Sequence, residues 1–200
     1  ISGAPTILHN IYGGGAYGSV GTFTYDGTTG MPTALATENT GPCTVTIKGG
    51  TIGSNGNENG MIFGSSRGDV SAPGEIHDHM AWVYDTHVVI GGDDSDPLIK
   101  GSVYGGGENG HVFVDAEVKV HSGTVGMTDD PTYPNRGNVY GAGCGTDTYT
   151  GTDSKTYFNP LAGIVLGNTT VEMDGGCVIR TIYGGGAMGS VGTYTTNDSG

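Results

Sequence analysis

An apolar residue recurs at every second position at four places along the chain, each time just before one or two glycines. The four copies of this alternating pattern span residues 45–52, 88–92, 118–125 and 171–178. Alternation with a period of two predicts β-strands that have one buried face. In the first copy, we expect Val45 and Ile47 to point into the protein, and Thr46 and Lys48 to point outward.

Opposite charges meet on the outer face if these copies lie side by side in register. Lys119 then lies next to Glu172, and His121 lies next to Asp174. Cross-strand pairs of this kind contribute roughly 0.2 to 1 kcal/mol each. The charged residues therefore favour the same register as the apolar ones.

A second repeated phrase consists of an aliphatic residue, an aromatic residue and a burst of glycines. Full copies occupy residues 11–20, 103–112 and 182–191, and altered copies occupy 62–70 and 139–145. We expect the aromatic members to form a ladder on the outside of the protein: Tyr12, Phe63, Tyr104, Tyr140 and Tyr183. We expect the aliphatic members to form a second ladder on the inside: Ile11, Ile62, Val103, Val139 and Ile182.

The two phrases together predict an all-β fold, a parallel, right-handed β-helix or β-solenoid of about five coils. A strand this short cannot bury its apolar face alone, but stacked units bury a continuous core. We expect one segment over residues 1–200, an excerpt of a longer repeat array. Insertions interrupt the units near residues 23–42, 72–86, 127–137 and 146–168, and in solenoids such insertions form loops on one face, often the binding face.

The glycine phrase also matches the G-x-G-x-x-G fingerprint of dinucleotide-binding sites, for example at Gly13, Gly15 and Gly18. That fingerprint needs a helix directly after it, because the pyrophosphate binds at the helix N-terminus. Residues 19–25 are β-prone and carry no helical period. The sequence therefore predicts no cofactor.

Composition and charge narrow the possible partners. Glycine contributes 41 of 200 residues, and the formal net charge is −13 with only seven Lys and Arg. This balance argues against nucleic acid and anionic membrane as partners, since both are bound through positive charge. No stretch is apolar for the roughly 18 residues of a membrane span, so we expect no membrane insertion. Neither end reads as a capping repeat, which predicts contact with neighbouring repeats or self-association.

Two groups of residues are candidate metal ligands. Glu75, His77 and His79 alternate along the chain and would share one face of a strand, as zinc ligands can. Asp93, Asp94 and Asp96 form an acidic turn, and calcium favours several carboxylates on a flexible loop. Solvated polar loops are the default interpretation of both groups. No fourth zinc ligand can be named for the first group. The acidic turn does not match the spacing of a known calcium loop, so calcium is the alternative there and not the default.

No nucleophile is paired with a base in the frame of a known catalytic motif. We therefore expect a non-enzymatic protein. Trp82 is a candidate ligand-binding residue, because aromatic faces pack against sugar rings. Residues 67–69 spell Arg-Gly-Asp, a tripeptide found in adhesive proteins, although the repeat itself already calls for the glycine. Of the three cysteines, Cys43, Cys144 and Cys177, each falls inside a repeat unit, where a small buried residue would serve.

By its V/I-Y-G-G-G-x-x-G-x-V phrase and its alternating strands, the chain resembles the large Gly- and Thr-rich tandem-repeat proteins on bacterial cell surfaces, especially those of Bacteroidetes. It resembles the β-helical regions of adhesins more distantly. The resemblance implies an extracellular, cell-surface or secreted structural segment of an adhesin or filament, with a glycan or host surface as a partner. The alternatives are a polysaccharide-processing β-helix enzyme, lyase or hydrolase, a glycan-binding module, and a segment of a phage fibre.

Overall fold

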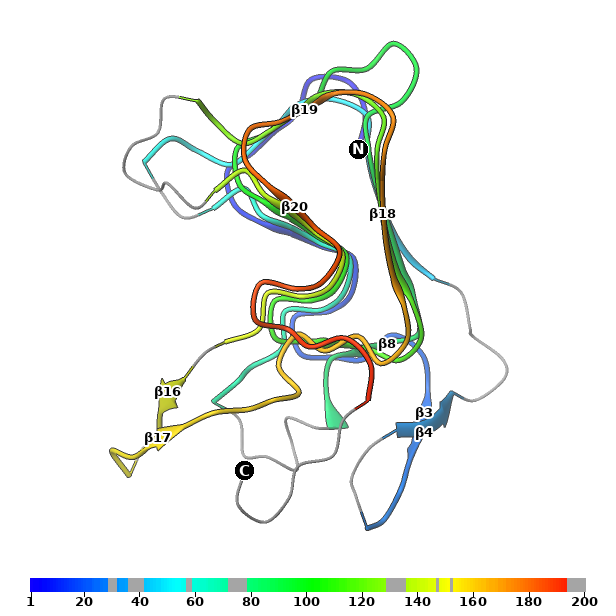
Figure 1. Cartoon of the computed structure of the whole chain (residues 1–200), viewed down its shortest axis with the longest axis vertical. Helices are drawn as coiled ribbons and strands as arrows, with labels where there is room; N and C mark the ends of the chain where they lie inside the picture. The colour runs from blue at the N-terminus through cyan, green and yellow to red at the C-terminus, as the bar shows by residue number, and fades with distance from the viewer. Residues whose placement is uncertain are drawn as a thin grey trace.

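The computed structural model describes residues 1–28, 32–35, 42–56, 59–71, 79–128, 136–146, 148–151 and 153–193. Every named element in this part of the chain is a β-strand, and most strands are parallel and lie in stacked sheets. The chain passes repeatedly through the same sheets, so that each pass lies on the previous one (Figure 1). The prediction of an all-β fold with parallel strands is confirmed.

The longest strands build what we call the long wall. It contains β5 (Cys43–Ile47), β9 (Thr86–Ile90), β13 (Ala116–Val120) and β18 (Thr169–Met173). These strands pair in parallel and without offset, so that Ile47, Ile90, Val120 and Met173 lie in one row. In all four copies of the pattern, the residues that precede the glycines fall on this wall, as predicted from the sequence.

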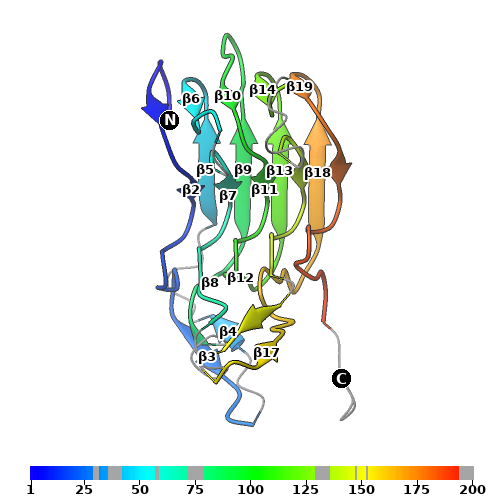
Figure 2. The same ribbon diagram turned by 90° about the vertical axis from the view of Figure 1, so that its left-hand side faces the viewer.

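Two further walls follow the long wall in each pass. The short wall contains β1 (Thr6–Ile7), β6 (Thr51–Ile52), β10 (Leu98–Ile99), β14 (Thr124–Val125) and β19 (Cys177–Val178). The aromatic wall contains β2 (Ile11–Tyr12), β7 (Ile62–Phe63), β11 (Val103–Tyr104), β15 (Val139–Tyr140) and β20 (Ile182–Tyr183). Both are five-stranded parallel sheets, in which strands from successive passes are neighbours (Figure 2).

A fourth wall follows the glycine phrase. It contains β8 (Trp82–Val83) and β12 (His111–Val112), and isolated parallel bridges extend it from Val112 to Val165 and on to Val191. The insertions near 72–86 and 146–168 are therefore shorter than expected. Trp82 and Val83 belong to the repeating wall, and so does Val165, because each pairs with the next pass.

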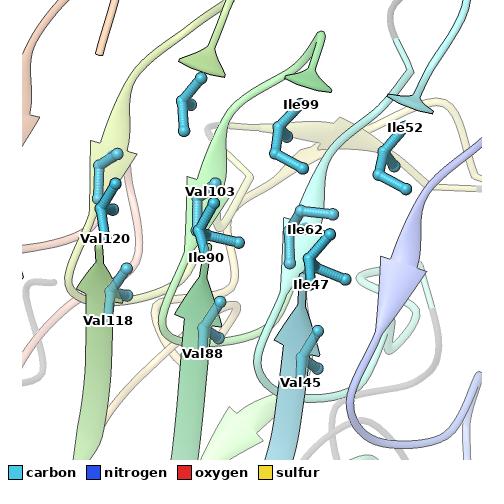
Figure 3. Packing of buried hydrophobic residues seen from close by; sticks show 12 residues of the cluster. Val45, Ile47, Ile52, Ile62, Val88, Ile90, Ile99, Val103, Val118 and Val120 are labelled. Carbon is cyan, nitrogen blue, oxygen red and sulfur yellow. The ribbon is translucent and has the colours of Figure 1, made fainter. Parts of the chain in front are cut away.

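The interior of the stack is a continuous aliphatic core. Side chains from the long, short and aromatic walls point toward one another in Figure 3, and Ile47, Ile90 and Val103 are fully buried. The core cluster consists of buried valine and isoleucine side chains. The inward orientation predicted for Val45, Ile47 and the aliphatic ladder is thus correct for the inner passes.

Glycine serves two different needs at the corners. The corner after the long wall requires a positive φ, which is 86° at Gly50 and 86° at Gly123, and glycine adopts this conformation without steric cost. The first glycine after the aromatic wall is needed because the backbone of the next pass lies directly against it. A Cβ added to Gly105 would lie 2.2 Å from the carbonyl oxygen of Gly141, so only glycine fits there.

Two antiparallel hairpins leave the stack beyond the fourth wall. One pairs β3 (Phe23–Tyr25) with β4 (Pro32–Leu35), and the other pairs β16 (Tyr149–Thr150) with β17 (Thr156–Tyr157). Both lie on the same side of the molecule in Figure 1. The described residues 126–128 and 136–138, which flank the insertion near 127–137, instead lie between the short and aromatic walls along the chain.

We predict that Ile90→Ala lowers the free energy of unfolding by about 2 to 5 kcal/mol, because it leaves a cavity in the core. Val89→Ala is the matched control, since Val89 lies on the outer face of the same strand and is half-buried. We expect a loss below about 1 kcal/mol for this control. Urea unfolding followed by circular dichroism measures both, and equal losses would contradict the assignment of the two faces.

We predict that Gly105→Ala destabilises the protein strongly, by about 1 to 3 kcal/mol or more, since its Cβ would overlap a backbone oxygen of the next pass. Gly27→Ala is the control, because no other described atom lies within 4 Å of its added Cβ and its φ is not positive. Thermal unfolding should show a lower Tm for the first variant and an unchanged Tm for the second.

Candidate functional site

The aromatic members of the glycine phrase form one stacked ladder along the aromatic wall. Ring centroids of successive members are 5.0, 4.9, 4.8 and 4.9 Å apart, and the interplanar angles are 10, 15, 7 and 7°. Strand pairing places the members in equivalent positions: Tyr12, Phe63, Tyr104, Tyr140 and Tyr183. The predicted ladder is confirmed.

The ladder lies on the opposite side of the aromatic wall from the aliphatic core, as alternation requires. Two of its three inner members are nevertheless buried, since Phe63 is 2% and Tyr104 is 7% exposed, and the third, Tyr140, is half-buried. Only the last ring, Tyr183, is largely exposed, at 44%. Because each ring covers the face of the next, the ladder offers its edges rather than ring faces to a ligand, which does not suit stacking against sugars.

Polar groups from the glycine phrases contact the hydroxyl ends of the ladder. The Tyr12 hydroxyl donates a hydrogen bond to the carboxylate of Glu108, and the Tyr104 hydroxyl is hydrogen-bonded to Cys144. Burial, together with Glu108, raises the pKa of Tyr12, and burial is also the main cause of the raised pKa of Tyr104. Burial raises the pKa of the Cys144 thiol as well. The hydroxyls of Tyr12 and Tyr104 and the thiol of Cys144 therefore stay protonated at neutral pH, which makes them poor nucleophiles and poor bases.

Trp82 does not fit the predicted role in ligand binding, because it is fully buried. Its ring contacts the ring of His111, with centroids 4.6 Å apart, and it lies near Phe23 from the first hairpin, at 6.3 Å. Phe23, Trp82 and Ile164 form a second hydrophobic cluster beyond the fourth wall. The insertion expected near residues 72–86 thus contributes Trp82 to this buried cluster, where its ring packs against the other members.

The structure places only part of the first candidate metal site. Glu75 and His77 lie outside the described residues, so their role stays a prediction. His79 is half-buried, its ring packs against Tyr25 at 4.4 Å, and its Nε2 atom has no hydrogen-bond partner among the described residues.

The second candidate metal site is an acidic turn on the surface. Asp93, Asp94 and Asp96 are exposed between β9 and β10. Within the described ranges, no three His, Cys, Asp or Glu side chains lie close enough to hold a metal ion. The structure therefore does not bring these carboxylates together as a calcium site.

The outer face of the long wall carries a group of charged side chains that lie within ion-pair distance of one another. Glu117 accepts from Lys119 at 3.0 Å and lies 2.8 Å from Nδ1 of His87. Lys119 lies 3.8 Å from Glu172 on the next pass, and His121 lies 2.7 Å from Asp174. Both predicted cross-strand pairs are confirmed. We call this group the charged face.

Two open depressions lie on the charged face. The larger, about 550 Å³, is lined by Lys48, Asp93, His121 and Asp174 together with backbone and Val89. The smaller, about 180 Å³, is lined by Asp85, His87, Asp115 and Glu117, among others. The charged face thus pairs carboxylates with Lys and His, an arrangement that sequence spacing indicated only for the two predicted pairs.

Folding shifts the pKa values of Glu117 and of Asp85, which lines the smaller depression, in opposite directions. The hydrogen bond from Lys119 is the main cause that lowers the pKa of Glu117 below its ordinary value of 4.5. Burial is the main cause that raises the pKa of Asp85 above 3.8, and one of its oxygens is buried without a partner among the described residues. Folding therefore favours the ionised form of Glu117 and disfavours that of Asp85.

The Arg-Gly-Asp tripeptide is engaged in local contacts. The Arg67 guanidinium lies over the Tyr17 ring at 5.7 Å, and Asp69 accepts a hydrogen bond from the Ser71 hydroxyl at 2.6 Å. Gly68 belongs to the altered glycine phrase at residues 62–70, which is one residue shorter than the full copies. Its φ is 70°, a conformation that favours glycine. The glycine is therefore explained by the repeat.

The three cysteines differ in exposure. Cys43 is buried, as expected, and burial raises its pKa to about 11, whereas Cys144 is half-buried and Cys177 is exposed. Cys177 lies on the last strand of the short wall, where no further pass of the described chain covers it.

Comparisons with known proteins give no match. No family model matches the chain, and neither a curated protein nor a solved structure is similar to it at a significant level.

We predict opposite stability changes for two substitutions on the charged face at pH 7. The lowered pKa of Glu117 means that its stabilisation is present above pH 4.5 and is lost as the pH falls through the folded value, so Glu117→Gln should reduce stability at pH 7. The raised pKa of Asp85 means that its ionised form opposes folding at pH 7, so Asp85→Asn should increase stability there. Each change should stay below about 1 kcal/mol.

Urea unfolding at pH 7 and at about pH 3 measures these differences. At the lower pH both differences should shrink, because both carboxyls take up protons as the pH falls. Glu172→Gln is the control: Glu172 is 55% exposed and lies 3.8 Å from Lys119, so it should change stability least. The same sign for Glu117→Gln and Asp85→Asn would contradict the interpretation.

Proposed function

We propose that residues 1–200 form a right-handed β-solenoid of about five coils that serves as a rigid, non-enzymatic structural segment of an extracellular adhesin or filament. The order of the walls in Figure 1, in which the chain turns counterclockwise from the long wall to the short and aromatic walls while it approaches the viewer, supports the right-handed coil. A right-handed connection is also the strong expectation for parallel strands.

The observation that carries this proposal is the unbroken register of core and ladder through every pass. The ring spacing of 4.8 to 5.0 Å matches the usual distance of about 4.7 to 4.9 Å between neighbouring strands. Backbone and side chains therefore repeat with the same step, so that passes stack without a growing mismatch. A stack of this kind forms a stiff spacer that holds its surface loops at fixed positions.

Two surfaces of this segment are available for adhesion. The charged face presents Lys, His and carboxylate side chains from successive passes in straight rows. The second hairpin presents exposed aromatic residues, Tyr157 at 41% and Phe158 at 58%. A glycan or host surface would contact these groups, whereas the buried Trp82 would not take part. The negative charge supports an extracellular, soluble setting over nucleic-acid binding.

We propose no membrane-inserted segment. In the described part of the chain, no helix has the length and apolar character that a bilayer crossing requires.

A polysaccharide-processing enzyme is the second candidate, and one observation favours it. The larger depression on the charged face places a His–carboxylate pair, His121 and Asp174 at 2.7 Å, beside Lys48. A basic residue and a paired histidine along the outer wall could bind an acidic sugar and move a proton. Asp174 is exposed, however, and the pair is not enclosed, so water is not excluded from it.

We predict no turnover when the protein is incubated with a panel of acidic and neutral polysaccharides in the presence of calcium. Assays for new reducing ends and for unsaturated products measure hydrolase and lyase activity separately. Turnover that disappears in His121→Ala, with folding unchanged by circular dichroism, would replace the structural proposal with the enzymatic one. Lys155→Ala is the control, since Lys155 is 76% exposed and pairs only with its neighbour Asp153 among the described residues.

A further inference from the structure

The dipeptide Asn-Gly occurs three times in the chain, at residues 55–56, 59–60 and 109–110. In this dipeptide, the backbone nitrogen of the glycine can attack the side-chain amide carbon of the asparagine, because glycine has no side chain that hinders the approach. Ammonia leaves and a succinimide ring forms, which water then opens to aspartate or isoaspartate. The reaction requires an asparagine side chain that can turn toward the following peptide, so the fold decides which copies can react.

The copy at residues 59–60 is held in place by hydrogen bonds and by packing. Asn59 is only 6% exposed. Its Oδ1 atom accepts from the Ser54 amide at 2.8 Å, and its Nδ2 atom donates to the Ser54 hydroxyl at 2.9 Å. A Cβ added to Gly60 would lie 2.7 Å from the Ile52 carbonyl oxygen, so backbone also crowds the peptide that would have to move. This copy is therefore protected from ring formation.

The copy at residues 109–110 is held in a similar way between two passes. The Asn109 side chain accepts a hydrogen bond from the Thr146 hydroxyl at 2.6 Å, and its backbone amide donates to the Arg67 carbonyl at 2.7 Å. A Cβ added to Gly110 would lie 2.6 Å from the Ser66 carbonyl oxygen. Both the side chain and the following peptide are thus fixed by neighbouring passes.

The copy at residues 55–56 lies in an exposed turn between β6 and β7. Both Asn55 and Gly56 are exposed. The φ of Gly56 is 68°, and no other described atom lies within 4 Å of its added Cβ. The packing that fixes the peptides at Gly60 and Gly110 is therefore not found around Gly56 among the described residues.

A lysine of the next pass contacts the oxygen on which charge develops during this reaction. The Lys100 ammonium donates to Oδ1 of Asn55 at 2.6 Å. Attack on the amide carbon places negative charge on this oxygen, and a cation that already donates to it stabilises the tetrahedral intermediate. Asn55 and Lys100 also line one open depression of about 360 Å³, together with Leu98 and Thr124.

We propose that Asn55–Gly56 is a self-modification site, at which Lys100 promotes succinimide formation and the product places a new carboxylate beside its ammonium. The bond from the Gly56 nitrogen to Cγ of Asn55 forms, and the bond from Cγ to Nδ2 breaks. The proton of the Gly56 amide leaves with the ammonia, and one water molecule then opens the ring. The chain gains one negative charge, and an ion pair replaces the Asn55–Lys100 hydrogen bond between two passes. This inference goes beyond the proposed structural role and does not depend on it.

Peptide mapping of the aged protein tests which copy reacts. Folded protein is incubated at mildly alkaline pH, digested at acidic pH and analysed by mass spectrometry that distinguishes aspartate from isoaspartate. Both products should accumulate at position 55. The rates at Asn59 and Asn109 should be at least about tenfold lower, because these two react only after local opening of the fold. In urea, all three should react at similar rates. Equal rates at the three copies in the folded protein would overturn the proposal.

The substitution Lys100→Met tests the part assigned to the ammonium, since it keeps an unbranched side chain and removes the charge. We expect ring formation at Asn55 to slow by about two- to tenfold in the folded protein and not to change in urea. Lys155→Met is the matched control, because Lys155 is 76% exposed on the second hairpin and should leave the rate at Asn55 unchanged. Circular dichroism checks that both variants fold.

Two results would contradict the role of Lys100. An unchanged or faster reaction in folded Lys100→Met would show that the ammonium does not promote the attack. A product that has lost ammonia and links Lys100 covalently to position 55 would show that the lysine, and not the Gly56 nitrogen, is the nucleophile. Neither result bears on the test for polysaccharide turnover, so failure of this inference is distinguishable from failure of the proposed function.

Discussion

Close approach of successive backbones is the constraint on which the rest of this structure depends. At the corner after the aromatic wall, the carbonyl of one pass occupies the place where the side chain of the previous pass would begin, as Gly105 and Gly141 show. This approach keeps the passes at the spacing of hydrogen-bonded strands. The same spacing lets the aromatic rings stack and the aliphatic side chains fill the interior. A single added methyl group would separate two passes and disturb all three interactions.

The repeating part of the fold was predictable from sequence because it has a period. Alternation around Val45 and Val118 marked the long wall, and the recurring Tyr and Phe marked the ladder and its register. Aligning the copies of the pattern in register also predicted the pairs Lys119–Glu172 and His121–Asp174, because each residue then lies beside its equivalent in the next copy. A single chain thus carried the information that usually requires comparison of many sequences, because its own repeats serve as copies of one another.

The parts between the repeats could not be predicted in the same way. Phe23, Trp82 and Ile164 meet in the second hydrophobic cluster although they are far apart in the chain and share no recurring phrase. Trp82 therefore looked like an exposed residue of an insertion, whereas the fourth wall includes it. The charged face could be predicted only in part for the same reason. Asp85 and His87 lie just before the pattern at residues 88–92, so the pattern does not include them. The pairing of successive passes is what places them near Glu117.

The direction of the hydrogen bonds between passes has a mechanical consequence. These bonds run along the stacking axis, so a force that draws the two ends of the stack apart acts along them and not across them. Each pass contacts mainly its neighbours, as in other repeat architectures. The terminal pass would then peel away before the next one is loaded, and a tether made of such passes would lengthen stepwise and absorb a sudden pull while its remaining part keeps its shape.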